Sequence, residues 1–341
     1  MGLLILLVLC SATCETDDVG SPPPVPRIEE GPLFGSDSAS PDDPTGGAVL
    51  GGIYDADVSA DSLIYVLESD WKKIVVFARD GSLRRTIMGG YGEGPGEFVR
   101  AVGMDVTPDG HSYVLDSGLS RVSIFDPDGG FVRSVSTGTI PVRDIAVHGD
   151  TIFLRVLFGS GEHALQAVSA DWEGYRPFLQ TSERDRAFSR AGFSGAIASD
   201  VRGRVVYAFG SPGEFVVIDS NGASPRRGLP LFPDDEPVTV ETAGGPQQRV
   251  TAGTLAVAII QDALVAILYA TYDIERADEI AHHVALYDWD GRFLGTLDFA
   301  ERGARVMAGG AAANTFYLNR SLPFPALVGY TLRFATDGQN R

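Results

Sequence analysis

Three aspartates are the residues of this chain whose type and spacing best suit chemistry. Asp57 and Asp105 lie 48 positions apart in two similar segments, and Asp144 is assigned as the third member of the series. Carboxylates gathered around one opening could bind a hard cation such as Ca²⁺, because that ion prefers several oxygen ligands. The alternative interpretation is that they are solvated carboxylates at the ends of strands and hold no ligand.

The histidines do not have the spacing of a metal or catalytic site. His111, His148 and His163 lie in different sequence contexts, and His282 and His283 are consecutive, so on a strand their side chains point to opposite faces. No nucleophile stands with a base and an orienting group in a recognisable pattern. The sequence therefore names no catalytic residue.

The elements that position the aspartates are repeats. Residues 57 to 85 recur without a gap at residues 105 to 133, so that Tyr65-Val66-Leu67 returns as Tyr113-Val114-Leu115. A repeat of roughly 40 to 50 residues indicates units that bury their apolar faces by stacking on one another.

Each unit is predicted to consist of short antiparallel strands. Residues 62 to 67 and 73 to 77 are rich in β-branched and aromatic side chains, as strands require. Asp-Gly or Asn-Gly dipeptides follow such runs and predict tight hairpins with type I′ turns. These dipeptides begin at Asp80, Asp109, Asp128, Asn221 and Asp290.

One acid and one base are kept five positions apart in both clear repeats. Glu68 and Lys73 in the first repeat correspond to Asp116 and Arg121 in the second. We expect each pair to form an ion pair that fixes a loop between strands, rather than to bind a ligand.

Six such units fit the chain and predict an all-β fold, a six-bladed β-propeller with four-stranded antiparallel blades around a central channel. The sixth unit shows only three strands. We therefore expect a segment within residues 27 to 35 to add the fourth strand of the last blade and join the two ends. The propeller is expected to span residues 27 to 336, followed by a C-terminal tail from 337 to 341.

The charge of the chain excludes some partners. Its formal net charge is -18, and its only lysines are Lys72 and Lys73. Such a negative field repels phosphate backbones and anionic lipids, so neither nucleic acid nor a membrane surface is an expected partner. A lipid anchor is then the only expected contact with a membrane.

The N-terminus predicts export. Residues 3 to 9 form an apolar run too short to span a bilayer but long enough for a signal peptide. Ser11-Ala12-Thr13-Cys14 after this run resembles a bacterial lipoprotein signal, with Cys14 rather than Cys10 as the lipidated residue. Simple secretion, an uncleaved anchor and a start further upstream are the alternatives.

The expected organisation is therefore a signal peptide at residues 1 to 14 and a disordered, proline-rich tether at residues 15 to 26. Because no cysteine follows Cys14, the folded part has no disulfide and no thiolate metal site. The expected location is the bacterial cell envelope, where the protein is either lipid-anchored or periplasmic.

The run Arg121-Val122-Ser123-Ile124-Phe125-Asp126-Pro127-Asp128-Gly129 resembles NHL-type propeller repeats. The glycine-rich segment from Gly89 to Phe98 resembles the linker of exported bacterial six-bladed propellers of the TolB-like group. This resemblance implies a fold and an exported setting but carries little function. The three-histidine zinc site of lyase relatives would need residues from several blades, and the histidine spacing here does not support it.

Three segments do not fit the repeated pattern of short strands and turns, at residues 180 to 195, 228 to 250 and 272 to 281. Insertions in repeat folds form loops, often on the binding face, although many are only surface decoration. The second segment supplies the candidate binding residues Phe232, Asp234, Asp235, Glu236 and Arg249.

Two functions follow as hypotheses. The first is a non-enzymatic, exported binding or scaffold protein, a monomer without a cofactor, that presents one propeller face to an envelope protein, a peptide or a glycan. The second is a Ca²⁺-dependent propeller hydrolase or lyase that works at the central channel with Asp57, Asp105 and Asp144.

Overall fold

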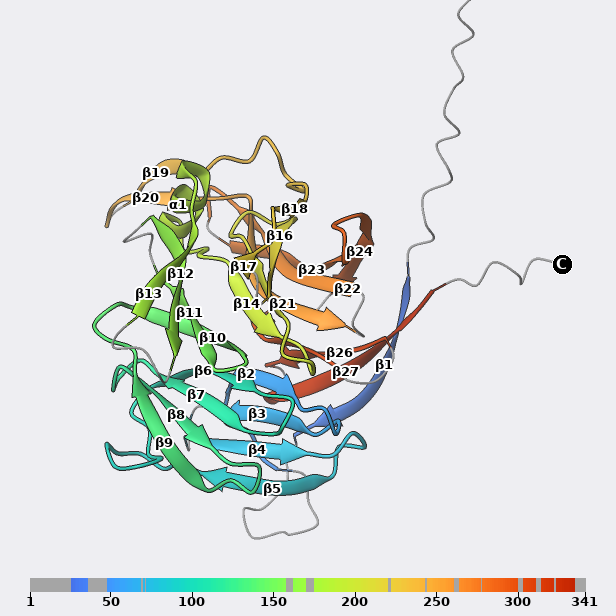
Figure 1. Ribbon diagram of the computed structural model, residues 1–341. Helices are drawn as coiled ribbons and strands as arrows, with labels where there is room; N and C mark the ends of the chain where they lie inside the picture. The colour runs from blue at the N-terminus through green and yellow to red at the C-terminus, as the bar shows by residue number, and fades with distance from the viewer. Residues whose placement is uncertain are drawn as a thin grey trace, which may run out of the picture.

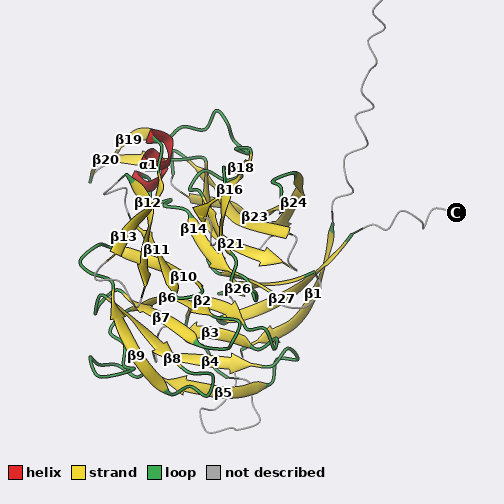
Figure 2. Cartoon of the chain, viewed as in Figure 1, coloured by secondary structure: helices red, strands yellow, loops and turns green. Residues whose placement is uncertain are grey.

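The computed structural model describes most of the chain after Val25. The described residues are 26–35, 48–68, 70, 72–157, 162–169, 175–219, 222–242, 244–260, 264–276, 278–299, 303–310, 314–321 and 323–334. The predicted signal peptide, Cys14, all of the tether except Pro26, and the C-terminal tail lie outside them. Within the described part, α1 (Glu183–Arg190) is the one α-helix, and no helix is long and apolar enough to cross a membrane (Figure 2).

The described strands form seven antiparallel sheets, of which six are the blades and the seventh is a two-stranded hairpin (Figure 1). Blade 1 contains β2 (Ile53–Val58), β3 (Ile64–Glu68), β4 (Lys73–Phe77) and β5 (Leu83–Met88), and blade 2 contains β6 (Ala101–Val106), β7 (Ser112–Asp116), β8 (Arg121–Phe125) and β9 (Phe131–Ser136). Blade 3 contains β10 (Val142–His148), β11 (Thr151–Val156), β12 (His163–Ser169) and β13 (Tyr175–Gln180).

The later blades follow the same order. Blade 4 contains β14 (Ala196–Ser199), β15 (Val205–Ala208) and β16 (Glu214–Asp219), with an outer edge shared by β17 (Gly222–Ala223) and β18 (Arg227–Gly228). The hairpin of β19 (Val238–Thr242) and β20 (Gly245–Arg249) is inserted next. Blade 5 contains β21 (Ala252–Ile260), β22 (Leu264–Asp273), β23 (Asp278–Asp288) and β24 (Phe293–Phe299).

The first strand of the chain completes the last blade, as predicted. Blade 6 has the order β1-β27-β26-β25, formed by β1 (Arg27–Phe34), β27 (Ala326–Arg333), β26 (Thr315–Arg320) and β25 (Met307–Gly309). Arg27 pairs with Arg333, and the side chain of Phe34 is fully buried between Phe77 of blade 1 and Tyr317 of blade 6. The N-terminal strand therefore closes the last blade, and its last residue, Phe34, belongs to the core.

The blades close into a ring. The innermost strands β2, β6, β10, β14, β21 and β25 contact one another in that cyclic order, and β25 returns to β2. The apolar core is divided into six clusters, each shared by two adjacent blades. Because every blade buries both faces against its neighbours, the six-bladed propeller predicted from the repeat is confirmed.

The Asp-Gly turns lie at hairpin tips, but their type differs from the prediction. Gly81 has φ +88° and its N–H donates to the carbonyl of Ala78 at 2.9 Å, whereas Asp80 is not among the residues of positive φ. A type I′ turn needs positive φ at both central residues. These hairpins instead use a type I turn followed by a left-handed glycine, which explains the register shift beside Phe77.

The ion pair expected in the second repeat is also wrong. Asp116 and Arg121 are register partners, yet each bonds to backbone groups elsewhere. The Asp116 carboxylate accepts hydrogen bonds from the N–H groups of Val99, Arg100, Gly118 and Leu119. Arg121 donates to the carbonyls of Glu93, Gly94 and Glu97 in the glycine-rich linker. Both side chains hold the connection between blades, and neither neutralises the other.

Candidate site in the central channel

The central channel contains a cavity of about 600 Å³. Inner strands of all six blades line it, together with residues 192–195, which follow helix α1, and Tyr272 at the end of β22. A concave space of this size, with contributions from many elements, is the usual place for a ligand in a propeller or barrel.

Four inner strands share one irregularity that sets the depth of each side chain in the channel. The register of each inner strand with the second strand of its own blade shifts by one residue. The shift lies between residues 53 and 55 in blade 1, 101 and 103 in blade 2, 142 and 144 in blade 3, and 254 and 256 in blade 5. The shift aligns Asp55, Gly103, Asp144 and Ala256 as one layer. Asp57 and Asp105 form the next layer, two residues further along their strands.

This register corrects one assignment made from sequence. Asp144 is not the third member of the row of Asp57 and Asp105, because Ala146 occupies that position in blade 3. Asp144 instead belongs to the layer of Asp55. The 48-residue offset that relates the first two blades does not extend to blade 3, so the sequence alone does not give this register.

Each channel aspartate joins its own blade to the next one. The carboxylate of Asp55 accepts a hydrogen bond from the N–H of Met104 at 2.7 Å, and that of Asp57 from Val106 at 2.6 Å. Asp105 accepts from the N–H of Val147 at 2.8 Å, and Asp144 accepts from the backbone of Ile197. These inter-blade hydrogen bonds connect blades 1 to 4, so the aspartates have a structural role in the ring.

Burial governs the protonation of these carboxyl groups. Desolvation raises the pKa of Asp105 to about 7, although hydrogen bonds from Ser199 and Val147 act in the opposite direction. Burial, followed by the charge of Asp105, raises the pKa of Asp57 well above its usual value. Burial, followed by the charge of Asp144, does the same to Asp55. Burial also raises the pKa of Asp144, while the nearby Arg155 lowers it.

The carboxylate oxygens of Asp57 and Asp105 already have hydrogen-bond partners within the protein. Asp57 and Asp105 share a hydrogen bond, and the Ser199 hydroxyl donates to Asp105 at 2.7 Å. Across the described part of the chain, no three His, Cys, Asp or Glu side chains gather closely enough to hold a metal ion. The residues that line the cavity include none of the histidines. The Ca²⁺ site at Asp57, Asp105 and Asp144 stays a prediction, without a supporting arrangement of free oxygens.

Tyr54, Asp55, Asp144, Phe193 and Tyr272 are among the residues that line the cavity, and this part of its lining is called the channel mouth. The rings of Phe193 and Tyr272 lie 5.4 Å apart, and Tyr54 is 41% exposed. Phe193 packs flat against the backbone of blade 5, because a Cβ at Gly253 would lie 2.2 Å from its ring. The mouth therefore combines aromatic surface with two carboxylates.

A second group of charges stands beside Tyr272. Arg305 lines the cavity and pairs with Glu279, and its guanidinium also lies 3.1 Å from Nε2 of the buried His282. The Tyr272 hydroxyl reaches Glu279 at 3.5 Å. These contacts fix the aromatic ring of Tyr272 relative to blades 5 and 6.

The predicted binding residues of the 228 to 250 insertion are mainly occupied by internal contacts. Phe232 packs edge-to-face on Tyr269 of blade 5 at 5.8 Å, and the Asp235 carboxylate accepts from the N–H groups of Thr251 and Ala252. Arg249 donates to the carbonyls of Ile274 and Glu275.

Asp234 and Glu236 lie on the exposed side of the same insertion, and Glu236 pairs with Arg184 at 2.8 Å. The structure does not bring the five predicted residues into one cavity.

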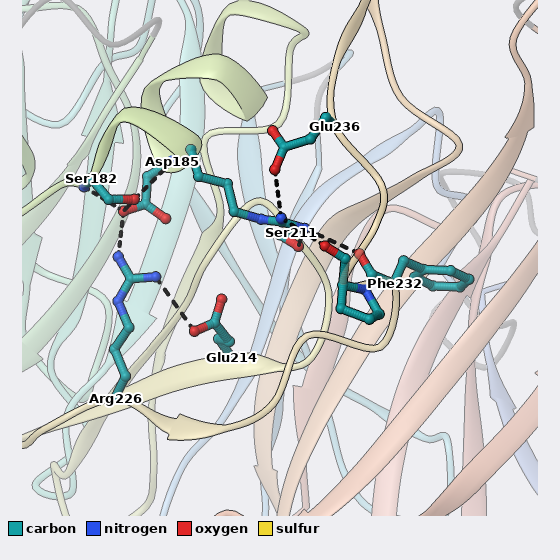
Figure 3. A network of polar contacts seen from close by, with 9 residues as sticks. Ser182, Asp185, Ser211, Glu214, Arg226, Phe232 and Glu236 are labelled. Atoms are coloured by element: carbon teal, nitrogen blue, oxygen red, sulfur yellow. Dashed lines mark hydrogen bonds and ion pairs between the residues drawn. The ribbon is translucent and has the colours of Figure 1, made fainter.

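Arg184 of α1 holds this insertion against the propeller. Its guanidinium donates to the carbonyls of Phe232, Pro233 and Asp235, as well as to Glu236. Arg226 forms a neighbouring contact with Asp185 and Glu214, so the helix is fixed from two sides (Figure 3). The helix in turn positions the 191 to 195 loop that carries Phe193.

The comparisons with known proteins agree with the fold. The structure is similar to a member of the duf4221 family from Bacteroides vulgatus, with a TM-score of 0.59, 10% identity, and coverage of 91% of this chain and 98% of that one. It is also similar to virginiamycin B lyase from Staphylococcus aureus, with a TM-score of 0.50, 9% identity, and coverage of 90% and 99%. No family model matches the chain, and no curated protein matches it.

These likenesses define the class of the protein as a six-bladed β-propeller. At such low identities they show the fold alone.

Proposed function

We propose that this chain is an exported binding propeller that holds a peptide or glycan ligand at the channel mouth. The observation that carries the proposal is the cavity of about 600 Å³ whose rim is built by two of the three insertions. Phe193 comes from the first insertion and Tyr272 from the third. The insertions thus have a shared location at one opening.

The composition of the rim fits recognition. Ligand cavities combine aromatic surface with a few fixed polar groups that orient the ligand. At the channel mouth the aromatic rings are Tyr54, Phe193 and Tyr272, and the polar groups include Asp55 and Arg143. Phe193 and Tyr272 pack on each other, and the Tyr272 hydroxyl reaches Glu279, which reduces the entropy that these two rings lose on binding.

The lining gives no comparable support to hydrolysis or elimination. Ser199 is a lining hydroxyl that donates to Asp105, but this carboxyl group also accepts from the backbone of Val147, so the contact serves to join the blades. Asp57 and Asp105 are engaged with each other and with backbone N–H groups. The activity in the name of the Staphylococcus aureus lyase belongs to that protein, and the shared fold does not extend it to this chain.

The export part of the proposal depends on the N-terminal sequence. An apolar run at residues 3 to 9, followed by Cys14, would place the propeller in the cell envelope on a short, polar tether, as in exported propellers of the TolB-like or NHL type. Membrane fractionation of the expressed full chain tests this. The wild type should sediment with membranes, and Cys14→Ser should release it without loss of the fold.

A peptide and glycan array probed with the labelled propeller tests the binding role. We expect array ligands whose affinity falls at least about tenfold in Tyr272→Ala, as for a central aromatic contact. Tyr91→Ala, which removes a ring that is 77% exposed on the linker between blades 1 and 2, is the matched control. Array ligands that are insensitive to Tyr272→Ala would show that binding uses another surface.

A further inference from the structure

Asp55 lies in the wall of the cavity without a cationic partner. Within the described residues its carboxylate accepts hydrogen bonds only from the N–H groups of Ala56 and Met104. By contrast, Asp144 has Arg155 at 3.4 Å, and Asp57 and Asp105 share a hydrogen bond. Of the four channel carboxylates, Asp55 is therefore the one that has, within the described residues, neither a cationic partner nor a hydrogen bond to another carboxyl group.

Blade 2 contributes a glycine to the layer of Asp55 and Asp144. Gly103 stands between them in the order of the blades, and a Cβ there would lie 3.2 Å from the Cα and 3.5 Å from Oδ1 of Asp144. The glycine therefore lets the inner strands of blades 2 and 3 pack closely. Both aspartates line the cavity.

Other cavity groups suit an organic cation. Phe193 and Tyr272 offer aromatic surface, which attracts ammonium and guanidinium groups. Thr254 lines the same cavity, is 3% exposed, and its hydroxyl has no hydrogen-bond partner within the described structure. An ammonium group has three donors, so it can use more than one oxygen acceptor.

We propose that the channel mouth recognises an alkylammonium or guanidinium group, as on the lysine or arginine side chains of a basic peptide, and that this group sits against Asp55. The inference rests on the proposed binding function and names its ligand class. The net charge of -18 favours approach of such a ligand. Arg143 at the cavity is placed to bind a backbone carbonyl or carboxylate of the same peptide.

An inorganic dication fits this location less well. Calcium takes 6 to 8 oxygen ligands, whereas both Asp55 oxygens already accept backbone N–H groups and Asp144 is paired with Arg155. A single ammonium or guanidinium group needs far fewer acceptors and gains from the aromatic rings.

Binding of a cation should be linked to proton release. Burial and the charge of Asp144 raise the pKa of Asp55, and a bound cation favours the ionised form, so the two effects oppose each other. Affinity should therefore rise as pH rises. The other charged groups that line the same cavity are Asp57 on the strand of Asp55, Asp105 of blade 2, Arg143, Asp144 and Arg155 of blade 3, and Arg305 of blade 6. Of these, Asp144 and Asp105 act on the pKa of Asp55.

Calorimetric titration of the intact propeller with trilysine and with Nε-acetylated trilysine tests the inference without a variant. We expect trilysine to bind and acetylation to weaken binding roughly 10- to 100-fold, as for loss of a charge-assisted hydrogen bond. Asp55→Asn should give a similar loss, whereas Asp128→Asn, which removes an exposed charge at a hairpin tip, should not. Trilysine should also release protons when it binds, seen as a dependence of heat on the buffer.

Two results would overturn the inference. Equal binding of the free and acetylated peptides would show that the cation is not recognised, and no binding of trilysine at about 1 mM would exclude a useful basic site. In either case, array ligands that still depend on Tyr272 would leave the proposed binding function intact. If Asp55→Asn fails to fold, the comparison of the two peptides decides alone.

Discussion

The side chain of Asp57 on β2 accepts a hydrogen bond from the backbone N–H of Val106 on β6, at 2.6 Å. The same aspartate shares a hydrogen bond with Asp105, whose carboxylate accepts from Val147 on β10. Carboxyl groups in the channel therefore connect three consecutive blades, and burial raises the pKa values of Asp57 and Asp105. Stability should consequently depend on pH in a definite direction.

The propeller should be more stable in mild acid than in mild base. A buried carboxyl whose pKa is raised from about 3.9 in the unfolded chain to about 7 in the folded state, as for Asp105, stabilises the fold below about pH 4. That stabilisation is lost as the pH rises through 7. We expect the melting temperature to fall by a few degrees between pH 5 and 8, measured by calorimetry.

Asp105→Asn should reduce this pH dependence. An amide can accept from the N–H of Val147 and donate to Ser199, so the variant keeps the contacts without a titratable proton. Asp128→Asn should leave the dependence as in the wild type. A pH dependence that is unchanged in Asp105→Asn would show that the proton lies elsewhere.

Millimolar calcium should not stabilise the propeller. A ligand that binds the native state raises its stability according to its concentration and affinity. The oxygens of Asp57 and Asp105 are already engaged, so we expect the same melting temperature in calcium and in chelator. A saturable increase that disappears in Asp57→Asn would restore the metal-dependent enzyme as the better hypothesis.

Loss of Arg184 should loosen the second insertion without opening the ring. Arg184→Ala removes donors to three backbone carbonyls and to Glu236, so hydrogen exchange of residues 228 to 242 should accelerate. Arg186→Ala is the control, because Arg186 bonds only within its own helical segment, to Glu183 and Thr181. Equal exchange in both variants would contradict the role given to Arg184.

The N-terminal strand should be required for a stable ring. Phe34→Ala deletes a fully buried ring between blades 6 and 1, and should lower the free energy of unfolding by about 3 to 5 kcal/mol. Tyr91→Ala should change it by less than about 0.5 kcal/mol, since that ring is mostly exposed. Chemical denaturation of both variants measures the difference. A loss at Phe34 no larger than at Tyr91 would mean that β1 contributes little.

The fold could be predicted because its signals are local and repeated. The recurrence of residues 57 to 85 at 105 to 133 defines the blade, and the missing fourth strand of the last unit pointed to residues 27 to 35, where β1 lies. Strand pairing within a blade joins segments that follow one another along the chain. That regularity is what a single sequence reveals.

The site could be predicted only in part, because it depends on contacts between distant segments. The segments that contain Phe193 and Tyr272 were recognised as insertions, but their meeting at one opening requires the ring to close. Asp55 was missed because it precedes the recurring segment and corresponds to Gly103 in blade 2, and its correspondence with Asp144 emerges only from the pairing register. The charged residues of the 228 to 250 insertion were predicted to bind a ligand, but most of them attach the insertion to the rest of the protein.

A crystal structure of the propeller with its best array ligand tests the central claim most directly. The account predicts ligand atoms within about 4 Å of Tyr272 and Phe193, with a cationic group at Asp55. A ligand bound on the outer strands or on the opposite opening, with the channel mouth unchanged, would contradict it.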